Sequence, residues 1–381
     1  MRKLDINNIY NCIFGGAIGD ALGYPVRDLS YDLIIDDYGK KGITDLVLDC
    51  DSRARITANT QLTIFTIDAL IRAYTRYHIH RETDITRKIT YNNYLRWQVY
   101  QNREYNKYID MKMIEDSYLN SIQEIKSERC PEQRMINILE NEVYSEKEIT
   151  ELNYNSGFAA ITKAMPFGIV FRKEMKLAFD MSVSIAKLTH NDPRAYLSSG
   201  AYSVIIASIA NGEILEKSIE NALIAIKDLE DSEQVVEKIE LAIKMSKDKT
   251  HYPEKFDDFG LCDESHEVLG AALYASLVYK DDISKALLFA SNNSCYGNNI
   301  ATLVGQILGL YKGLDDVTKE WIKLLEMSQE ITRLVREFNC IIEGNLPNEI
   351  EKDDAITDID EIKSLSKKQI AKWWVEKYDK I

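Results

Sequence analysis

The sequence is poor in residues that interrupt helices, since only six prolines occur among 381 residues. It also lacks a Gly/Ser-rich or Pro-rich stretch that would divide it, which favours one compact domain over two domains joined by a linker. Dense blocks of Lys and Arg are missing, and the formal net charge is −14. Because binding to phosphate backbones depends on clustered cations, we expect neither a nucleic-acid partner nor an anionic membrane as partner.

Long apolar runs are missing too, and none reaches the length of a transmembrane helix. The N-terminal stretch MRKLDINNIYNCIFGGAIGDALG is interrupted by Asp5 and lacks the apolar core and cleavage site of a secretory signal. The cysteines show neither CxxC nor Cys/His metal spacing, so we expect reduced thiols in a cytoplasmic protein. These cysteines are Cys12, Cys50, Cys130, Cys262, Cys295 and Cys340.

Apolar residues recur at helical spacing through most of the chain, whereas alternating strand patterns are missing. Such stripes are Leu62, Phe65, Ala69, Leu70 and Ala73; Ala201, Val204, Ile205, Ser208 and Ile209; and Ile300, Leu303, Val304, Ile307, Leu308 and Tyr311. Asp192 is a candidate N-cap with Pro193 at the first helical position, and Gly313 is suited to close the helix that follows Ile300. The sequence therefore predicts an all-α protein.

Two stretches look like additions to a main helical domain at residues 1–344. Residues from about 100 to 154 are polar, charged and rich in tyrosine, as a variable insertion would be. Residues 345–381 combine a polar loop with a short helical pattern that includes Trp373 and Trp374. We expect that C-terminal helix to dock on the body of the protein.

Two segments near the N-terminus are candidates for chemistry. In FGGAIGDALGYPVRD, Gly15, Gly19 and Gly23 recur every four residues around Asp20. Such a stripe most often means close packing of two helices, and the Gly-Lys-Ser/Thr ending of a P-loop is missing. In RITANTQLTIFTIDAL, the polar residues from Thr57 to Thr60 lie at a predicted helix start, where Thr57 or Asn59 is a routine cap.

Three further candidates follow. YNSGFAAITKAMPFGIVF contains a turn at Ser156 and Gly157, and LTHNDPRA places His190 at a corner between helices. A lone His at a corner is more often a structural hydrogen-bonding residue than a catalytic base. The third, NNSCYGNNIATLVGQILGLYKG, is a polar loop that runs into an apolar helix, whose start offers free N–H groups and a positive dipole end.

The order and spacing of these segments resemble the ADP-ribosylglycohydrolase family, which includes the dinitrogenase-reductase-activating glycohydrolases. The resemblance covers most of the chain, through GGAIGDALGYPV, TANTQLTIFTIDALI, SGFAAITKAMPFGI, THNDPRA, EVLGAALYASLV, NNSCYGNNIATLVGQILGLYKG and EWIKLLE. It implies a compact orthogonal bundle of helices with a cleft that holds two divalent cations, usually magnesium or manganese. In the family these cations bind the ribose and activate water for cleavage of an N- or O-glycosidic bond.

The metal-ligating carboxylates that this resemblance implies are replaced here. In active members one cluster supplies a hydroxyl and two carboxylates, and another supplies two aspartates and a Thr or Ser. The matching positions are Thr57, Ala58 and Asn59 in the first cluster, and Tyr296, Asn298 and Asn299 in the second. Asparagine keeps the shape of aspartate without its charge, and a pair of divalent cations needs anionic oxygens.

The acidic residue that is implicated in catalysis in some family members aligns with Arg27, so the sign of the charge is reversed. From these replacements we expect no metal cofactor. We interpret the protein as a catalytically impaired pseudoenzyme that binds ADP-ribose or an ADP-ribosylated protein. Arg27 and the start of the helix after Asn299 are candidates to hold a pyrophosphate, although Arg27 is equally suited to pair with Asp28.

Two alternatives stay open. One is an active ADP-ribosyl-protein hydrolase with a divergent metal site, in which Asp20, Thr57 and His190 take part. The other is a protein-interaction module whose cleft is vestigial and plugged by Tyr296 or by a paired Arg27. The sequence identifies neither the protein partner nor the oligomeric state, for which a monomer is the default.

Overall fold

The computed structural model describes residues 4–101, 111–141, 155–294, 296–347 and 370–380. Within these ranges every regular element is a helix. Two isolated β-bridges join described residues, Ala54 with Leu325 and Gly157 with Glu264. The predicted all-α class is therefore confirmed. None of the helices in these ranges is both long and apolar enough to cross a membrane.

The α-helices are α1 (Ile6–Gly23), α2 (Tyr31–Tyr38), α3 (Ala58–His80), α4 (Thr86–Tyr100), α5 (Met111–Glu115), α6 (Gln133–Asn141), α7 (Ala159–Thr162), α8 (Met165–Val170), α9 (Met175–Ala186), α10 (Pro193–Ala210), α11 (Leu215–Ile226), α12 (Glu233–Met245), α13 (Ser265–Val278), α14 (Ile283–Ser291), α15 (Gly297–Tyr311), α16 (Asp316–Leu324), α17 (Ser328–Glu343) and α18 (Lys372–Tyr378). Short 3₁₀ turns are η1 (Tyr24–Val26), η2 (Tyr118–Ser121), η3 (Glu124–Lys126) and η4 (Pro253–Phe259).

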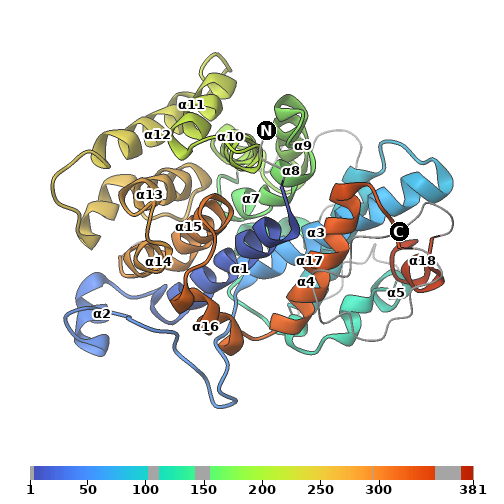
Figure 1. Ribbon diagram of the computed structural model, residues 1–381, viewed down its shortest axis with the longest axis horizontal. Helices are drawn as coiled ribbons and strands as arrows, with labels where there is room; N and C mark the ends of the chain where they lie inside the picture. Colours follow the sequence, from blue (N-terminus) through green and yellow to red (C-terminus); the bar gives the residue numbers. More distant parts are fainter. Residues whose placement is uncertain (1–3, 102–110, 142–154, 295, 348–369, 381) are drawn as a thin grey trace.

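The most extensive contact between two of the described helices is that of α1 with α15, in the middle of the molecule (Figure 1). A side chain on Gly15 would overlap the backbone of Gly305, and one on Gly19 would overlap the carbonyl of Ala301. At the end of α1, Gly23 approaches the backbone of Asn298 in the same way. The glycine stripe is thus a packing surface, as its spacing predicts, and it brings the backbones of two helices into contact.

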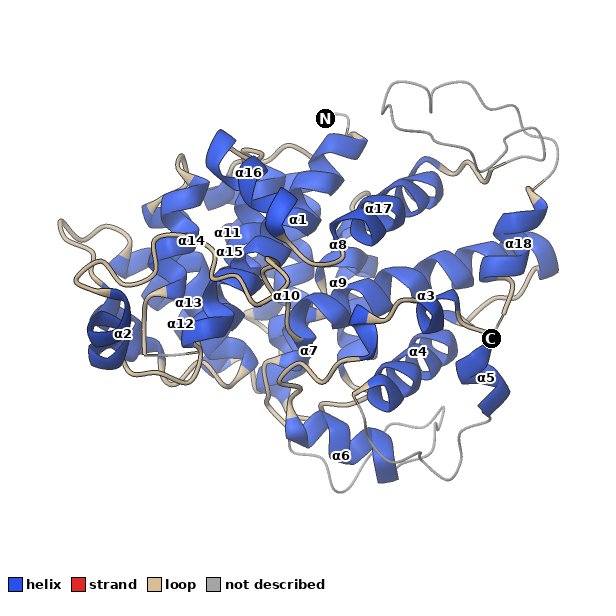
Figure 2. Ribbon diagram, turned by 90° about the horizontal axis from the view of Figure 1, so that it is seen from below, coloured by secondary structure: helices blue, strands red, loops and turns tan. Residues whose placement is uncertain are grey.

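The remaining helices pack to either side of this pair. In Figure 2, α3, α4, α17 and α18 lie on one side, while α12, α13 and α14 lie on the other. Helices α3 and α10 carry the predicted apolar stripes but are buried almost all round, α10 from Ser198 to Ala210 without interruption. The sequence pattern marks one face of each helix; the structure buries their small and polar faces as well.

The C-terminal helix α18 contacts α3. Trp374 is fully buried, and its indole N–H donates to Thr75 Oγ1 at 2.8 Å. Lys377 Nζ donates to Glu337 Oε1 at 2.6 Å, and the Tyr378 hydroxyl donates to the other oxygen of the same carboxylate. Parts of the predicted insertion and extension, residues 102–110, 142–154 and 348–369, lie outside the described residues.

The glycine contact between α1 and α15 can be tested with Gly19→Ala. Alanine is favoured over glycine inside a helix by ~1 kcal/mol, but here its methyl group would meet the Ala301 carbonyl. We expect the overlap to prevail and to lower the free energy of unfolding by ~1–3 kcal/mol in urea denaturation. Asn7→Ala, at an exposed position of the same helix, is the control and should change little. A Gly19→Ala protein as stable as the wild type would contradict the assigned contact.

Candidate functional site

The candidate site is built around the carboxylate of Asp20, near the end of α1. Thr57, the N-cap of α3, donates its hydroxyl to Asp20 Oδ1 at 2.6 Å and its backbone N–H to Oδ2 at 2.7 Å. Thr60 donates to Oδ2 through its hydroxyl at 2.7 Å and its backbone N–H at 3.2 Å. Asp20 therefore caps the start of α3 from another helix, where a negative charge suits the helix dipole.

Three asparagine amides lie beside this carboxylate. Asn59 Nδ2 is 3.0 Å from Asn299 Oδ1 and 3.4 Å from Asp20 Oδ1, and Asn298 Nδ2 is 3.5 Å from Thr57 Oγ1. The Oδ1 atoms of Asn59 and Asn298 are buried and have no hydrogen-bond partner in the described part of the chain. The structure thus brings together five of the predicted residues, and two of them present amide oxygens without donors.

Arg27 and Tyr296 form the edge of this group. The guanidinium carbon of Arg27 lies 5.2 Å from the centre of the Tyr296 ring, which is a cation–π distance. Arg27 Nε is 3.4 Å from Asp28 Oδ1, and Nη1 donates to the Cys130 carbonyl at 3.4 Å. Tyr296 precedes α15 in the left-handed region, at φ 35°. Arg27 thus pairs with Asp28, as one reading of the sequence predicts, and also stacks on Tyr296.

The centre of the site is closed to solvent. Asp20, Thr57, Asn59, Asn298 and Asn299 are at most 2% exposed. Burial raises the pKa of Asp20, although the hydrogen bonds from Thr57 and Thr60 oppose this shift.

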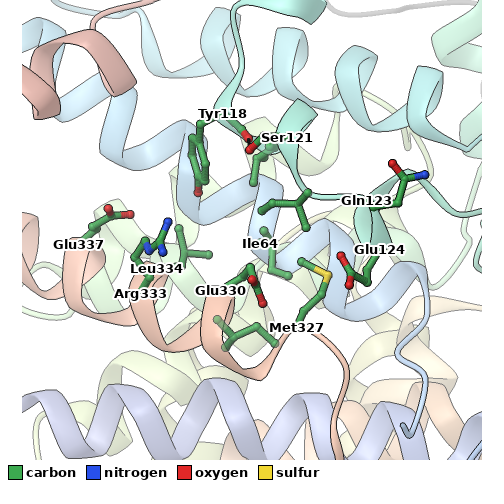
Figure 3. Close-up of a pocket in the computed structure, with 13 residues that line it drawn as sticks. Ile64, Tyr118, Ser121, Gln123, Glu124, Met327, Glu330, Arg333, Leu334 and Glu337 are labelled. Atoms are coloured by element: carbon green, nitrogen blue, oxygen red, sulfur yellow. Dashed lines mark hydrogen bonds between the residues drawn. The ribbon is translucent and has the colours of Figure 1, made fainter. Parts of the chain in front are cut away.

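A cavity of about 300 Å³ lies elsewhere, between α3, α17 and the segment of η2 and η3 (Figure 3). Its lining includes Ile64, Tyr118, Met327 and Leu334 but none of the predicted site residues. We therefore attach the candidate chemistry to the Asp20 group and not to this cavity.

His190 belongs to a different, fully buried chain of polar groups. Lys163 Nζ donates to Thr189 Oγ1 at 2.6 Å, and Thr189 Oγ1 lies 2.8 Å from His190 Nδ1. Since the lysine occupies a lone pair of the hydroxyl, the threonine proton is free to point at Nδ1, which leaves the imidazole proton on Nε2. That Nε2 lies 3.2 Å from Glu132 Oε1. His190 is thus a structural hydrogen-bonding residue in this arrangement.

Glu132, which the sequence analysis missed, receives two more donors. Asn155 Nδ2 donates to Oε1 at 2.6 Å, and the Ala159 N–H donates to Oε2 at 2.9 Å. Burial alone would raise the pKa of Glu132, but His190 and these donors hold it at about 2. Burial lowers the pKa of Lys163 to about 7 and also lowers that of His190. Nothing in the stretch RCPEQRM distinguishes Glu132 from a solvent-exposed acid.

Ser156 and Gly157 lie against the start of α13. Ser156 Oγ donates to Glu264 Oε1 at 2.8 Å, and the Ser265 hydroxyl donates to the Gly157 carbonyl at 2.7 Å. Glu264, His266 and Glu267 place one potential metal-ligand atom each within 4.8 Å of the others. Arg194 already donates to Glu264 Oε2 at 2.7 Å, which places a cation where a metal would have to bind.

The fold and the closed polar site agree with the class of protein that the sequence motifs imply. The sequence profile of the ADP-ribosylglycohydrolases matches residues 1–349, so the chain belongs to this family. A curated relative, the ADP-ribosylarginine hydrolase Tri1 of Serratia proteamaculans (strain 568), is 23% identical over 183 residues. That match covers 48% of this chain and 46% of the relative, so it spans about half of each protein.

A solved structure described as an ADP-ribosylglycohydrolase-related protein complex has the same fold. It superimposes with a TM-score of 0.54 over 87% of this chain and 97% of the other, at 15% sequence identity. The similarity confirms the bundle type that the resemblance implies.

Family membership corrects one expectation. We expected no cofactor, but the chain belongs to a hydrolase family that normally uses metal ions. The buried oxygens of Asn59 and Asn298 lack donors among the described residues, and amide oxygens are suitable neutral ligands for a hard cation. The charge of a cation pair is not matched, because the carboxylate among these residues is that of Asp20, and both its oxygens already accept hydrogen bonds.

The pKa of Glu132 predicts a pH-dependent contribution to stability. Because its folded pKa lies at about 2, below the ordinary 4.5, the contribution is present above pH 4.5 and is lost as pH falls toward 2. Glu132→Gln should therefore lower the free energy of unfolding at neutral pH by about 3 kcal/mol, the free energy equivalent to lowering the pKa from 4.5 to about 2. In urea denaturation, the difference in the free energy of unfolding between variant and wild type should become smaller below pH 4.5. A difference in stability that does not vary with pH would contradict the assignment of Glu132 as a carboxylate that stays ionised well below pH 4.5.

Proposed function

We propose that this protein binds an ADP-ribosyl group, as free ADP-ribose or on a modified protein, and cleaves it slowly or not at all. In this proposal the Asp20 group is the site at which the ligand binds. The arginine-linked ADP-ribosyl group named for the Serratia relative is the first candidate substrate class.

The observation that carries the proposal is the chemistry of the donor set. Asn59, Asn298 and Asn299 occupy positions at which the family resemblance implies ligating carboxylates. They are linked through Asn59 and Thr57 to one carboxylate, that of Asp20, which is engaged in capping α3. A bound divalent cation supplies a Lewis acid that lowers the pKa of water. Neutral amides at Asn59 and Asn298 would hold such a cation weakly. In this proposal the site therefore still binds the ADP-ribosyl group but has lost most or all of its hydrolytic activity.

Charge at the edge of the site supports recognition of an anion. Burial and the neighbouring Cys130 raise the pKa of Tyr24, while Arg129 and Arg27 oppose this shift, so two guanidinium groups lie near the same hydroxyl. Arg27 lies beside Asp28 and Arg129 beside Glu326, so binding of an anion would exchange these carboxylates for the phosphates of the ligand. Guanidinium groups match the geometry of phosphate oxygens, as a pyrophosphate-bearing ligand requires.

One observation favours a second candidate function, a protein-interaction module with a vestigial cleft. Arg27 already pairs with Asp28 and stacks on Tyr296, and the groups beneath are buried. A permanently filled cleft would not bind ADP-ribose. The two functions therefore differ in a direct binding measurement.

That measurement is calorimetric titration of chelator-treated protein with ADP-ribose, repeated with Mg²⁺ and with Mn²⁺. We expect binding in the wild type and about a tenfold or greater loss in Arg27→Ala, because a hydrogen bond to a charged group is removed. Arg27→Lys is the matched control, which keeps the charge without the planar fork and should lose less.

Turnover is measured in parallel on an ADP-ribosylated arginine substrate. Hydrolysis at about 1 s⁻¹ or faster, an ordinary enzymatic rate, would overturn the impaired-enzyme proposal. If ADP-ribose does not bind in any condition, the protein-interaction function is favoured instead.

Restoring charge at the site gives a second test, with Asn59→Asp combined with Asn298→Asp. Without a cation, two added carboxylates beside Asp20 should repel one another and lower the free energy of unfolding by about 2 kcal/mol or more. Mn²⁺ at 100 times its Kd should return about 2.7 kcal/mol, and the variant should bind Mn²⁺ more tightly than the wild type.

The control for this pair is Asn345→Asp, which makes the same chemical change at an exposed position. Its stability should not depend on Mn²⁺. If the double variant gains no affinity for Mn²⁺, these asparagines do not occupy ligand positions and the assignment of the site is wrong.

A further inference from the structure

Residues 127–132, called the strap below, run across the start of α3. The backbone N–H of Ala58, the first residue of α3, donates to the Arg129 carbonyl at 2.8 Å. One turn later, Gln61 Nε2 donates to the Ser127 carbonyl at 3.2 Å. The N–H groups at a helix start are otherwise free to bind an anionic ligand, so the strap takes one of them at the turn that carries Thr57 and Asn59.

The strap also reaches the start of α15. Arg27 donates to the Cys130 carbonyl and stacks on Tyr296, the residue that precedes α15. The strap is therefore linked to both helix starts that supply the candidate site. Cys130 has φ of 51°, a conformation that a non-glycine residue keeps only where its surroundings hold it.

Two acids hold the ends of the strap. Arg129 Nη2 donates to Glu326 Oε2 at 3.2 Å, and the other oxygen of Glu326 accepts the Ile56 N–H at 2.8 Å. At the far end Glu132 is buried among Asn155, the Ala159 N–H and His190. The Glu132 carboxylate also fills the space that a side chain on Gly157 would take.

We infer that the strap is an internal inhibitor of the Asp20 site, latched by Glu132, and that it must leave the start of α3 before a ligand reaches Asp20. This inference rests on the proposed function for the identity of the ligand, ADP-ribose. The strap lowers apparent affinity, because only molecules with the strap open bind, and affinity scales with their fraction.

The test compares wild type with Glu132→Gln, which keeps the shape of the latch and removes its charge. The control is Glu124→Gln, at an exposed position of the neighbouring η3. Hydrogen–deuterium exchange is followed in peptides that cover residues 56–61 and 127–132, and ADP-ribose binding is measured by calorimetry. We expect Glu132→Gln to speed exchange in both peptides about tenfold and to tighten binding several-fold, with no change in the control.

The exchange data separate this inference from the proposed function. If exchange is faster in both peptides of Glu132→Gln but neither the wild type nor the variants bind ADP-ribose, the strap is supported and ADP-ribose is ruled out as the ligand. If Glu132→Gln and Glu132→Ala fold but show unchanged exchange, the strap inference is wrong. It is also wrong if exchange is faster but ADP-ribose binds with the affinity of the wild type.

If the Glu132 variants fail to fold, wild-type protein decides the matter. Saturating ADP-ribose should speed exchange in residues 127–132 relative to the free protein. Slower or equal exchange in the bound state would show that the ligand reaches its site with the strap in place, and the inference fails.

Discussion

The contact between α1 and α15 is the constraint on which the site depends. Gly15 and Gly19 have no side chains, so the two backbones touch along the helices, and Gly23 extends the contact to Asn298. This close approach places Asp20, which lies between Gly19 and Gly23 on α1, near the first turn of α15. Larger residues at these glycines would separate the helices and open the polar centre, where an unpaired carboxylate is costly to bury. Packing and site geometry are therefore set by the same residues.

Asp20 also fixes the position of a third helix, α3. It accepts hydrogen bonds from two hydroxyls and two backbone N–H groups at the start of α3, so it fixes α3 against the α1–α15 pair. A carboxylate with this many donors is tied to its structural role. The neighbouring asparagines suit such a centre, because amides satisfy one another in part, as Asn59 and Asn299 do, whereas carboxylates in their place would need cations.

Local signals in the sequence predicted the helices, the glycine packing surface and a cap at Thr57 or Asn59, because each depends on neighbours within one or two helical turns. The structure shows Thr57 as the cap. The stripe from Ile300 to Tyr311 predicted α15 but described only its apolar face. The opposite face, with Gly305 and Gln306, is buried against α1 through a contact of long sequence separation. The latch was not predictable either, since Glu132 and His190 are 58 positions apart and acquire their roles only when the fold joins them.

The reversed charge at Arg27 and the neutral amides beneath it are physically linked. A guanidinium at the edge of a cation pair would be repelled. Beside neutral amides, Arg27 is free to stack on Tyr296 and to donate to the Cys130 carbonyl of the strap. The strap can cross the start of α3 because the Ala58 N–H there needs an acceptor, which the Arg129 carbonyl supplies. The neutral amides at the centre and the strap over the start of α3 are thus energetically compatible, because each lowers the cost of the other. Both leave the Arg27 guanidinium at the edge of the site.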